Sequence, residues 1–268
     1  MTVLYIWWTV VLHQQISEEV SVFRFKQFDV VNESSAMKVN TDGVLLGAAM
    51  TVRPEDRTFL DVGTGTGTIA LMAAQRIVRL LSADGCTDTS DLRIDAIDID
   101  RPSAAEAEAN FRRSPWSVML NAANMSLDEY ADSAPDASFD LIFSNPPYFE
   151  SSLPAPQERR NAARHTSALS YRELLDFAAA RLSAHGRISM VLPADQEAGL
   201  CRHARMCGLH LFHIMRIRTV PRKIPSRIIA EFSRSRCLQP VEELLTIQDE
   251  GKYTEEYLSL TRDFYLFA

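Results

Sequence analysis

The sequence has few cysteines. This shortage bears on the structural class of the protein and on the cellular compartment in which we expect it. Its 268 residues include only four, Cys86, Cys201, Cys207 and Cys237, and none belongs to a C-x-x-C pair. A disulfide scaffold needs a much higher density, so we expect reduced thiols in a reducing compartment, the cytoplasm. Cys201, His203 and Cys207 lie close in sequence but lack the paired ligand spacing of zinc modules, and we predict no metal site.

The chain also lacks an apolar run long enough to cross a bilayer, which takes about 20 residues. Its apolar start, Met1 to Leu12, is too short, and it has neither the basic segment nor the cleavage site of a signal peptide. We therefore predict residues 1–20 to be a poorly ordered extension and expect no stable membrane association. Without internal repeats or convincing linkers, residues 21–268 are predicted to form one monomeric domain, with an N-terminal cover at 21–56 and a core at 57–268.

An overall surplus of basic charge is missing as well. The net charge is −7, and the contents of 46% hydrophobic and 24% charged residues are those of an ordinary globular protein. Positive charge is instead concentrated between Cys201 and Arg236, where nine lysines and arginines accompany a single acid, Glu231. Such a basic block can neutralise phosphates, although a solvated face is the alternative.

Strand-like and helix-like patterns alternate along the core. We expect strands at residues 58–62, 93–99, 117–120, 139–144 and 187–192, separated by helices, and further strand-like runs follow up to Phe232. This alternation predicts an α/β fold with a doubly wound, mostly parallel seven-stranded sheet of the Rossmann-like type. A hairpin arm is expected in the N-terminal cover.

A glycine-rich loop stands where the first core strand passes into a helix. The loop carries Asp61, Gly63, Gly65 and Gly67. Glycines allow positive φ and let a ligand approach the backbone, while the helix N-terminus offers free N–H groups. The spacing G-x-G-x-G differs from the G-x-G-x-x-G of dinucleotide sites. With the preceding acid it resembles motif I of class I methyltransferases, whose cofactor, S-adenosylmethionine, has no phosphate. A tight turn with packing glycines is the alternative.

The next two strand ends carry further candidates for the cofactor site. Asp98 and Asp100 share a face by alternation, and either carboxylate can accept hydrogen bonds from both ribose hydroxyls. The motif resemblance favours Asp98, although either acid can instead cap a helix. Asn124, after the third strand, stands where such families usually hold an Asp against the adenine. Its amide keeps a carbonyl acceptor, so the contact can survive.

The segment Asn145-Pro146-Pro147-Tyr148 directly follows an apolar strand. An amine on adenine, or a carboxamide, has a delocalised lone pair and is a poor nucleophile. The side-chain oxygen of Asn145 and the carbonyl of Pro146 can accept its N–H bonds and direct the lone pair, and the two prolines fix these acceptors in place. The ring of Tyr148 can stack on a flipped-out base. The segment predicts methylation of a planar amino nitrogen without a metal; a surface turn is the alternative.

These motifs resemble the bacterial tRNA (adenine-N6)-methyltransferases that modify valine tRNA at position 37, the adenine just 3′ of the anticodon. The resemblance runs from about Phe23 to Phe267 and includes the more specific segments Thr41–Gly47 and Tyr253–Tyr265. It implies a class I methyltransferase fold, S-adenosylmethionine as cofactor and tRNA as partner. It also implies that the segment beginning with Thr41 and Asp42 helps form the cofactor pocket. The start of the chain departs from the family pattern.

If the substrate is RNA, basic residues on two segments are the candidates for binding it. The candidates are Arg222, Lys223 and Arg227 in the basic block, and Arg159, Arg160 and Arg164 in a proline-containing loop. The Asn-Pro-Pro-Tyr motif also occurs in DNA N6-adenine and protein glutamine N5 methyltransferases, so both substrates remain alternatives. The basic block argues against protein, and no target-recognition domain for DNA is apparent. The glycine spacing and this motif disfavour a NAD-linked oxidoreductase and a non-catalytic nucleotide-binding module, and the latter is the alternative from another functional class.

Overall fold

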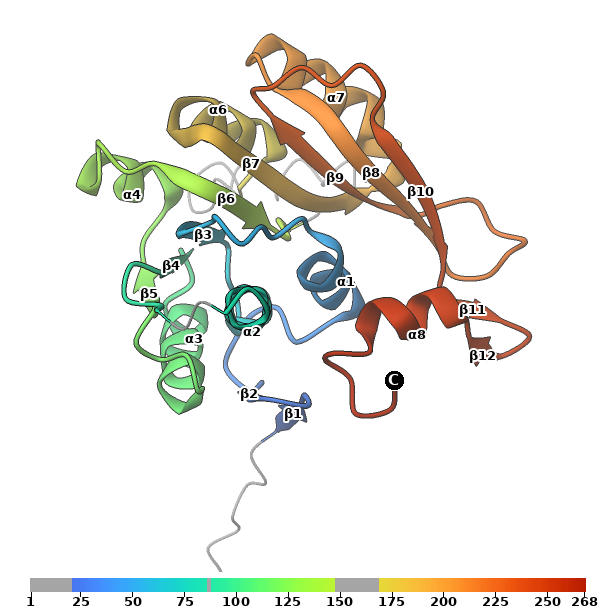
Figure 1. Ribbon diagram of the computed structural model, residues 1–268, viewed down its shortest axis with the longest axis horizontal. Helices are drawn as coiled ribbons and strands as arrows, with labels where there is room; N and C mark the ends of the chain where they lie inside the picture. The colour runs from blue at the N-terminus through green and yellow to red at the C-terminus, as the bar shows by residue number, and fades with distance from the viewer. Residues whose placement is uncertain (1–20, 86–87, 148–168) are drawn as a thin grey trace, which may run out of the picture.

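A single twisted sheet forms the centre of the molecule in the computed structural model, which describes residues 21–85, 88–147 and 169–268 (Figure 1). Its eight strands lie in the order β10-β8-β9-β7-β6-β3-β4-β5. Their bounds are Thr58–Val62 for β3, Arg93–Asp98 for β4, Leu120–Asn124 for β5, Phe139–Ser144 for β6, Leu182–Pro193 for β7, His210–Arg218 for β8, Arg227–Ser233 for β9 and Val241–Thr246 for β10. The predicted extension at 1–20 lies outside the described residues.

The strands are mostly parallel, as predicted, because only β9 runs against its neighbours. The predicted number of seven strands is wrong, since β10 adds an eighth at the edge, parallel to β8. Its first four residues are exposed and include two glutamates, so the strand has no apolar signature. Ion pairs fix it instead: Glu243 with His213, and Glu242 with Arg216.

Two other strand boundaries differ from the prediction. Residues 115–119 form a turn, so β5 begins only at Leu120. The strand predicted at 187–192 begins earlier, because α6 ends at Arg181 and β7 starts at Leu182, with a register shift against β6 before Arg187. Both errors come from short segments in which the side-chain pattern does not distinguish a turn from the end of an element.

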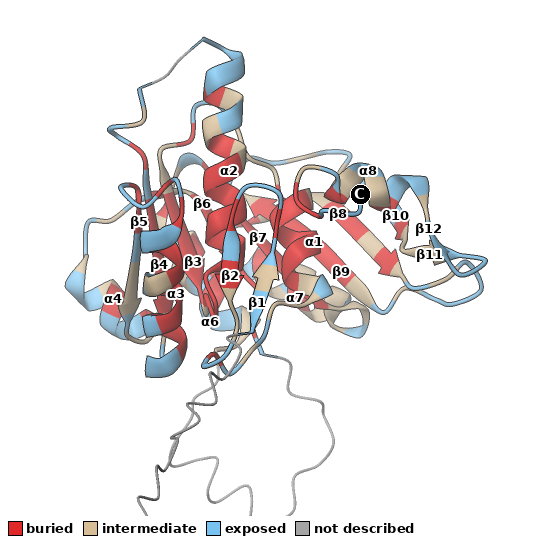
Figure 2. Cartoon of the chain, turned by 90° about the horizontal axis from the view of Figure 1, so that it is seen from below, coloured by how far each residue is buried: buried red, intermediate tan, exposed pale blue. Residues whose placement is uncertain are grey.

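Helices cover both faces of the sheet, as a doubly wound fold requires. Alternate residues of β3 show this, because Phe59 packs in one apolar cluster with α1, α2 and α3, whereas Leu60 and Val62 pack in the other with α4, α6 and α7. The helices are α1 (Thr41–Ala49), α2 (Thr68–Ala83), α3 (Arg101–Arg113), α4 (Leu127–Ser133), α6 (Tyr171–Arg181), α7 (Glu197–Met206) and α8 (Glu255–Thr261), with a 3-10 turn, η1, at Ala194–Gln196. Figure 2 shows that the buried residues run through the sheet and along α2. Within the described ranges, no helix has both the length and the apolar character needed to cross a membrane.

The predicted hairpin arm is present and joins the two ends of the described chain. It consists of β1 (Val22–Arg24) and β2 (Asp29–Val31), and Phe25 forms a bridge to Tyr265. A second hairpin, β11 (Gln248–Asp249) with β12 (Lys252–Tyr253), follows β10. The N-terminal cover is therefore anchored on the C-terminal segment as well as on the core.

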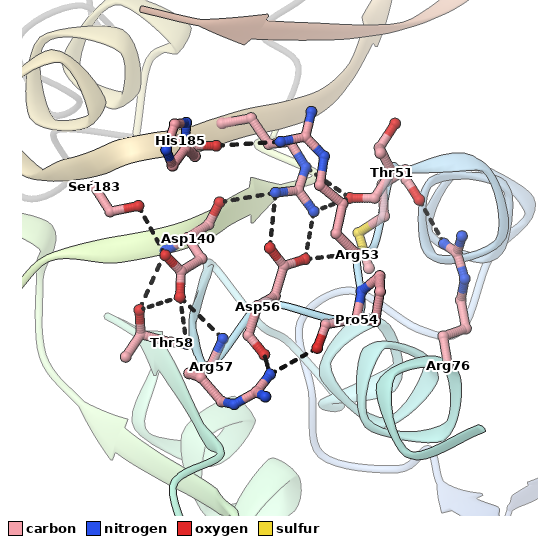
Figure 3. Close-up of polar contacts among 12 residues, drawn as sticks. Thr51, Arg53, Pro54, Asp56, Arg57, Thr58, Arg76, Asp140, Ser183 and His185 are labelled. Carbon is pink, nitrogen blue, oxygen red and sulfur yellow. Dashed lines mark hydrogen bonds and ion pairs between the residues drawn. The ribbon is translucent and has the colours of Figure 1, made fainter. Parts of the chain in front are cut away.

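The amino ends of β3 and β6 meet β7 at a buried polar network. Arg187 is fully buried on β7 and pairs with Asp56, which is 2% exposed. The Arg187 guanidinium donates to Asp56 Oδ1 at 2.9 Å and, through Nε, to the carbonyl of Thr51 at 2.9 Å. Figure 3 shows Asp56 at the centre of this network, between Thr51 and Asp140. The network lies at the amino ends of these parallel strands. The sequence motifs lie at the opposite, carboxyl ends.

Candidate functional site

The three motif-bearing strand ends lie side by side. β6, β3 and β4 are neighbours in the sheet and run parallel, so their carboxyl ends share one edge. A cavity of about 290 Å³ opens there, and its lining includes Gly63 and Gly65 after β3, Asp98 at the end of β4, and Asn145 and Pro147 after β6. The glycine loop is therefore central, with the Asp98 carboxylate on one side and the Asn145 amide on the other. This is the site expected in an open α/β sheet.

The glycine loop has the backbone that its sequence predicts. Gly63, Gly65 and Gly67 have φ values of 72°, 56° and 81°, a region that disfavours side chains. At Gly67 a Cβ would also lie 2.5 Å from the Phe111 ring, so no other residue fits without a shift. Gly67 caps α2 and does not line the cavity. Its role is to bring α2 close to α3.

Asp61 lies beneath the loop rather than in the cavity wall. Its side chain is fully buried, and Oδ2 accepts a hydrogen bond from Thr64 Oγ1 at 2.7 Å. Oδ1 has no hydrogen-bond partner among the described residues. Burial raises the pKa of Asp61 to about 7. A buried acceptor without a partner, directly under a ligand loop, is suited to a cationic or hydrogen-bond-donating group of a ligand.

Asp98 and Asp100 both line the cavity, but their hydrogen-bond partners differ, and the difference favours Asp98 as the ribose acceptor. Asp100 is the N-cap of α3, and its carboxylate accepts from the backbone N–H of Ser103. Asp98 lines the cavity, accepts from the N–H of Gly65 at 2.8 Å, and burial raises its pKa. Asn124 does not line the cavity; its Nδ2 donates to the carbonyls of Asp98 and Ile99. Asn124 therefore supports the turn that presents Asp98, and a direct contact with the adenine stays a prediction.

Asn145 is held at the end of β6 from two sides. The preceding Ser144 donates through Oγ to the carbonyl of Val62 at 2.7 Å, which ties β6 to β3. Asn145 is 6% exposed, and its Nδ2 donates to Met37 Sδ at 3.4 Å. Pro146 is buried and Pro147 is exposed at the cavity. Tyr148, the last residue of the motif, lies outside the described residues.

A segment of the N-terminal cover closes the cavity from above the loop. Residues 36–40 all contribute to the lining, and a Cβ on Gly65 would lie 3.4 Å from the Met37 carbonyl oxygen. The segment is anchored by the carboxylate of Glu106 on α3, which accepts from the backbone N–H groups of residues 33, 34 and 35 at 2.7 to 2.9 Å. Asn110, one turn later, binds both backbone groups of Val31. The spacing of Glu106 and Asn110 places them on one face of the helix.

The start of α1 contributes less to the cavity than the resemblance implied. Neither Thr41 nor Asp42 lines it, whereas Asn40 and Gly43 do. Asp42 instead pairs with Arg227, with 2.9 Å between the carboxylate and Nε. A predicted cofactor residue and a predicted RNA residue thus bind each other and connect α1 to the first residue of β9.

The basic block does not form one continuous face. Arg216 pairs with Glu197 and Glu242, and Arg234 donates to a carbonyl on α6. Arg222 and Lys223 are exposed in the loop between β8 and β9, at the same edge as the cavity, because β8 is parallel to β6 through β7 and β9. The remaining candidates, Arg159, Arg160 and Arg164, lie outside the described residues.

Several lining residues were not predicted from the sequence. They come from the segment after β5 and from the start of α6: Met125, Ser126, Leu127, Asp128, Leu169 and Glu173. Both groups adjoin a capping box, in which a serine and a glutamate three residues later exchange hydrogen bonds at the start of a helix. This S-x-x-E signal is readable in the sequence and places a helix start at the cavity edge.

Comparison with known proteins identifies the family. Residues 33–199 match the family described as the methyltransferase small domain. The chain is 39% identical over 246 residues to a tRNA1(Val) (adenine(37)-N6)-methyltransferase of Phocaeicola vulgatus, covering 91% of this chain and 97% of that one. It is 40% identical over 247 residues to the enzyme of the same name from Parabacteroides distasonis, with the same coverage.

The solved structures confirm the fold independently. A predicted O-methyltransferase from Agrobacterium tumefaciens superposes with a TM-score of 0.56 at 16% identity, covering 83% of this chain and 96% of that one. At such low identity the likeness concerns the class I methyltransferase fold alone. The chain therefore belongs to the methyltransferase small domain family and to the same family as the two bacterial tRNA1(Val) (adenine(37)-N6)-methyltransferases.

Proposed function

We propose that this protein transfers a methyl group from S-adenosylmethionine to N6 of the adenine at position 37 of a valine tRNA. The observation that carries the proposal is the position of Asn145, beside the glycine loop in one cavity, in a chain whose relatives bear the name of that activity. The side-chain amide of Asn145 indicates methylation of an amine, and the names of the relatives indicate the substrate.

The acceptor groups in the cavity and beneath the glycine loop fit this cofactor. Asp98 supplies a carboxylate for two ribose hydroxyls, whose hydrogen bonds would stabilise its charged form and offset the burial that raises its pKa. Asp61 Oδ1, which is buried and has no hydrogen-bond partner in the described part of the chain, is suited to the cationic amino-acid end. Apolar side chains of Ile97, Ile99 and Leu127 line the β4 side, where a planar base can pack. S-adenosylmethionine supplies, when bound, a methyl group on a positively charged sulfur.

The residues after β6 prepare the amine. The Asn145 side-chain oxygen and the Pro146 carbonyl accept its two N–H bonds, which concentrates electron density on nitrogen and orients its lone pair. The contact of Nδ2 with Met37 sets the direction in which the amide faces. Pro146 and Pro147 restrict the backbone, so the acceptors need little rearrangement when the base arrives. Burial of Asn145 strengthens both hydrogen bonds because water competes less.

The test uses purified protein, labelled S-adenosylmethionine and an unmodified valine tRNA transcript. We expect label in this tRNA, none in a transcript with guanine at position 37, and none in DNA or release-factor protein. Label in protein or DNA would establish the corresponding alternative instead. Because a misfolded preparation would also give no label, cofactor binding is measured separately. S-adenosylhomocysteine should raise the melting temperature of the protein, and NAD should not.

Asn145→Ala is the matched variant. We expect kcat to fall by about 10²- to 10³-fold, the effect of removing one preorganised hydrogen-bonding group at a reacting centre. The dissociation constant of S-adenosylhomocysteine should stay within about twofold of the unaltered protein, because the lost oxygen contacts the amine rather than the cofactor. An Asn145→Ala protein with full activity is incompatible with the mechanism.

We also propose that the protein acts as a monomer in the cytoplasm. Cys201, Cys207 and Cys237 are free thiols, in keeping with a reducing compartment. Light scattering at the concentration used for the methyltransfer assay tests the first point, and a mass of twice the chain would contradict it.

A further inference from the structure

A cluster of three metal-binding side chains lies between α6 and α7, apart from the cofactor cavity. It consists of Asp176 on α6 with His203 and Cys207 on α7 and its C-cap. His203 Nε2 lies 2.9 Å from Asp176 Oδ1, and Cys207 Sγ lies 3.0 Å from the same oxygen. All three ligand atoms lie within 4.8 Å of one another. Methyl transfer, as derived above, uses none of them.

The geometry points to a zinc site of three protein ligands at this cluster. Tetrahedral Zn²⁺, with bonds of about 2.0–2.3 Å to nitrogen, oxygen and sulfur, needs ligand atoms about 3.3–3.6 Å apart. The two shorter distances, which share Asp176 Oδ1, must each open by about half an ångström, and a small rotation of the exposed Asp176 side chain supplies this change. Asp176 is 62% exposed, so water can reach the open fourth position.

The backbone around the cluster is preorganised. His203 and Cys207 are four residues apart, on one helical face, and the Cys207 N–H donates to the His203 carbonyl at 3.1 Å. Their neighbours Leu200 and Ala204 are buried, as are Leu174 and Leu175 beside Asp176. The two helices are thus fixed by their apolar contact, and the three ligands stand at its rim.

The choice of ligands selects the metal. One carboxylate is too few for Ca²⁺, and Mg²⁺ prefers oxygen ligands throughout. Imidazole and thiolate together suit Zn²⁺ and its spectroscopic substitute Co²⁺. The sequence did not reveal Asp176 as a partner, because it lies 27 positions before His203, with strand β7 between them. Cys201, which the sequence grouped with them, is not a member of the cluster among the described residues.

Cobalt titration of the full chain, freed of metal with EDTA, tests the site. We expect one equivalent of Co²⁺ to produce a thiolate-to-cobalt charge-transfer band that Zn²⁺ abolishes and Mg²⁺ does not. Cys207→Ser should lose the band, while Cys201→Ser, on the same helix, should keep it. Asp176→Asn and His203→Gln should weaken cobalt binding by at least about tenfold, the lower end of what even outer partners of metal ligands contribute.

Stability measurements complete the test. Zn²⁺ should raise the melting temperature of the unaltered protein and of Cys201→Ser, and should leave that of Cys207→Ser unchanged. Should Cys207→Ser not fold, the His203→Gln titration decides. Absence of a charge-transfer band in the unaltered protein, or a band that survives Cys207→Ser, would overturn the proposal.

Discussion

Asp61, which is fully buried, and Asp98, which is half-buried, both lie beside the glycine loop, but their surroundings give them different tasks. Asp98 accepts from the N–H groups of Gly65 and Asp100 and remains open to the cavity. Asp61 has one hydroxyl donor and one oxygen without a partner in the described structure. The first is suited to neutral hydroxyl groups, whereas the second is stabilised as an anion only when a cation or donor approaches.

Cofactor binding should therefore depend on the ionisation of Asp61. Burial raises its pKa to about 7, so the carboxyl is mostly protonated at pH 6 and mostly ionised at pH 8. If the anion is the binding form, its fraction rises from about one tenth to nine tenths, and the dissociation constant of S-adenosylhomocysteine should fall about ninefold. Calorimetry at the two pH values measures this change.

Asp61→Asn is the control for this prediction. It keeps the shape of the side chain but cannot ionise, so its affinity should be weaker at pH 8 and nearly the same at both pH values. Any pH dependence that it retains belongs to the ligand and is subtracted. A ninefold change that persists in Asp61→Asn would exclude Asp61 as its source.

At the scale of single residues, the sequence predicted which residues lie at the site better than it predicted which residues they contact. The positions of Gly63, Gly65, Asp98 and Asn145 in one cavity follow from strand ends that meet at one edge, which is a property of parallel sheets. The pairing of Asp42 with Arg227 joins residues 185 positions apart and depends on how α1 packs against the sheet. No local pattern encodes such a contact.

The segment that closes the cavity is an element without regular secondary structure, and its order comes from α3. The Glu106 carboxylate is 6% exposed; burial alone would raise its pKa, but hydrogen bonds from residues 33–35 outweigh this and lower it. The carboxylate is therefore ionised and holds consecutive N–H groups that no strand or helix satisfies. Lys38 closes the turn by donating to the Asn32 carbonyl.

Removing this anchor should weaken cofactor binding more than it weakens the fold. For Glu106→Ala we expect the dissociation constant of S-adenosylhomocysteine to rise about tenfold, or about 1.4 kcal/mol. Asn110 and Lys38 still hold the segment, so the loss is partial. Glu106→Gln retains one acceptor oxygen for the N–H groups and should recover at least half of the lost binding energy. Equal affinity for Glu106→Ala and the unaltered protein would show that the segment needs no anchor.

The loop between β8 and β9 is a second irregular element at the same edge. The backbone N–H of Ser226 in this loop donates to the Ile217 carbonyl, and the N–H of Ala194, which follows β7, donates to the Ser226 carbonyl. Arg227, the next residue, reaches α1 through Asp42. The loop is thus fixed next to the cavity, with Arg222 and Lys223 exposed on it.

Arg222→Ala should weaken tRNA binding and make it less sensitive to salt. Each phosphate contact adds close to one unit to the slope of log K against log salt, so the slope should become shallower by about one. Arg236→Ala is the matched control, because Arg236 is also exposed but follows β9 at the opposite edge of the sheet. Equal slopes for the two variants would remove Arg222 from the RNA surface.

Elements with a clear apolar period were predictable, and edge elements were not. β3 and β6 are buried over most of their length and α2 over its first half, so their apolar composition indicates their place in the core. β10 is exposed over most of its length and is held by His213, whose hydrogen bond to Glu231 raises its pKa to about 9 and keeps it protonated at neutral pH. An edge strand fixed by ion pairs leaves no alternating pattern for the sequence to show.

Across the whole molecule, the groups that bind the ligand and the groups that stabilise the fold lie at opposite ends of the sheet's strands. The carboxyl ends of the strands hold the glycine loop, Asp98 and Asn145, together with Asp61 Oδ1, a buried atom with no hydrogen-bond partner among residues 21–85, 88–147 and 169–268. The amino edge holds Arg187 and Asp56, whose charges are paired and hydrogen-bonded within the fold. A site that must accept a ligand keeps polar groups incompletely satisfied, and the other edge can compensate through a complete network.

The stability of the whole domain should therefore respond strongly to Arg187. Arg187→Met removes the cation and leaves Asp56 buried and unpaired, which should lower the free energy of unfolding by about 3–5 kcal/mol. The double variant Arg187→Met with Asp56→Leu removes both charges and should recover most of that loss, because two apolar side chains need no partners. Urea denaturation of the three proteins measures both values.

An exposed ion pair supplies the comparison. Arg112 and Glu108 pair one turn apart on α3, and their side chains are 72% and 48% exposed. Arg112→Ala should cost less than about 0.5 kcal/mol, because water already screens this pair. If Arg187→Met were as mild as Arg112→Ala, the buried pair would add nothing to the fold. If the double variant were as unstable as Arg187→Met, the loss would come from the missing hydrogen bonds to Thr51 rather than from an unpaired Asp56.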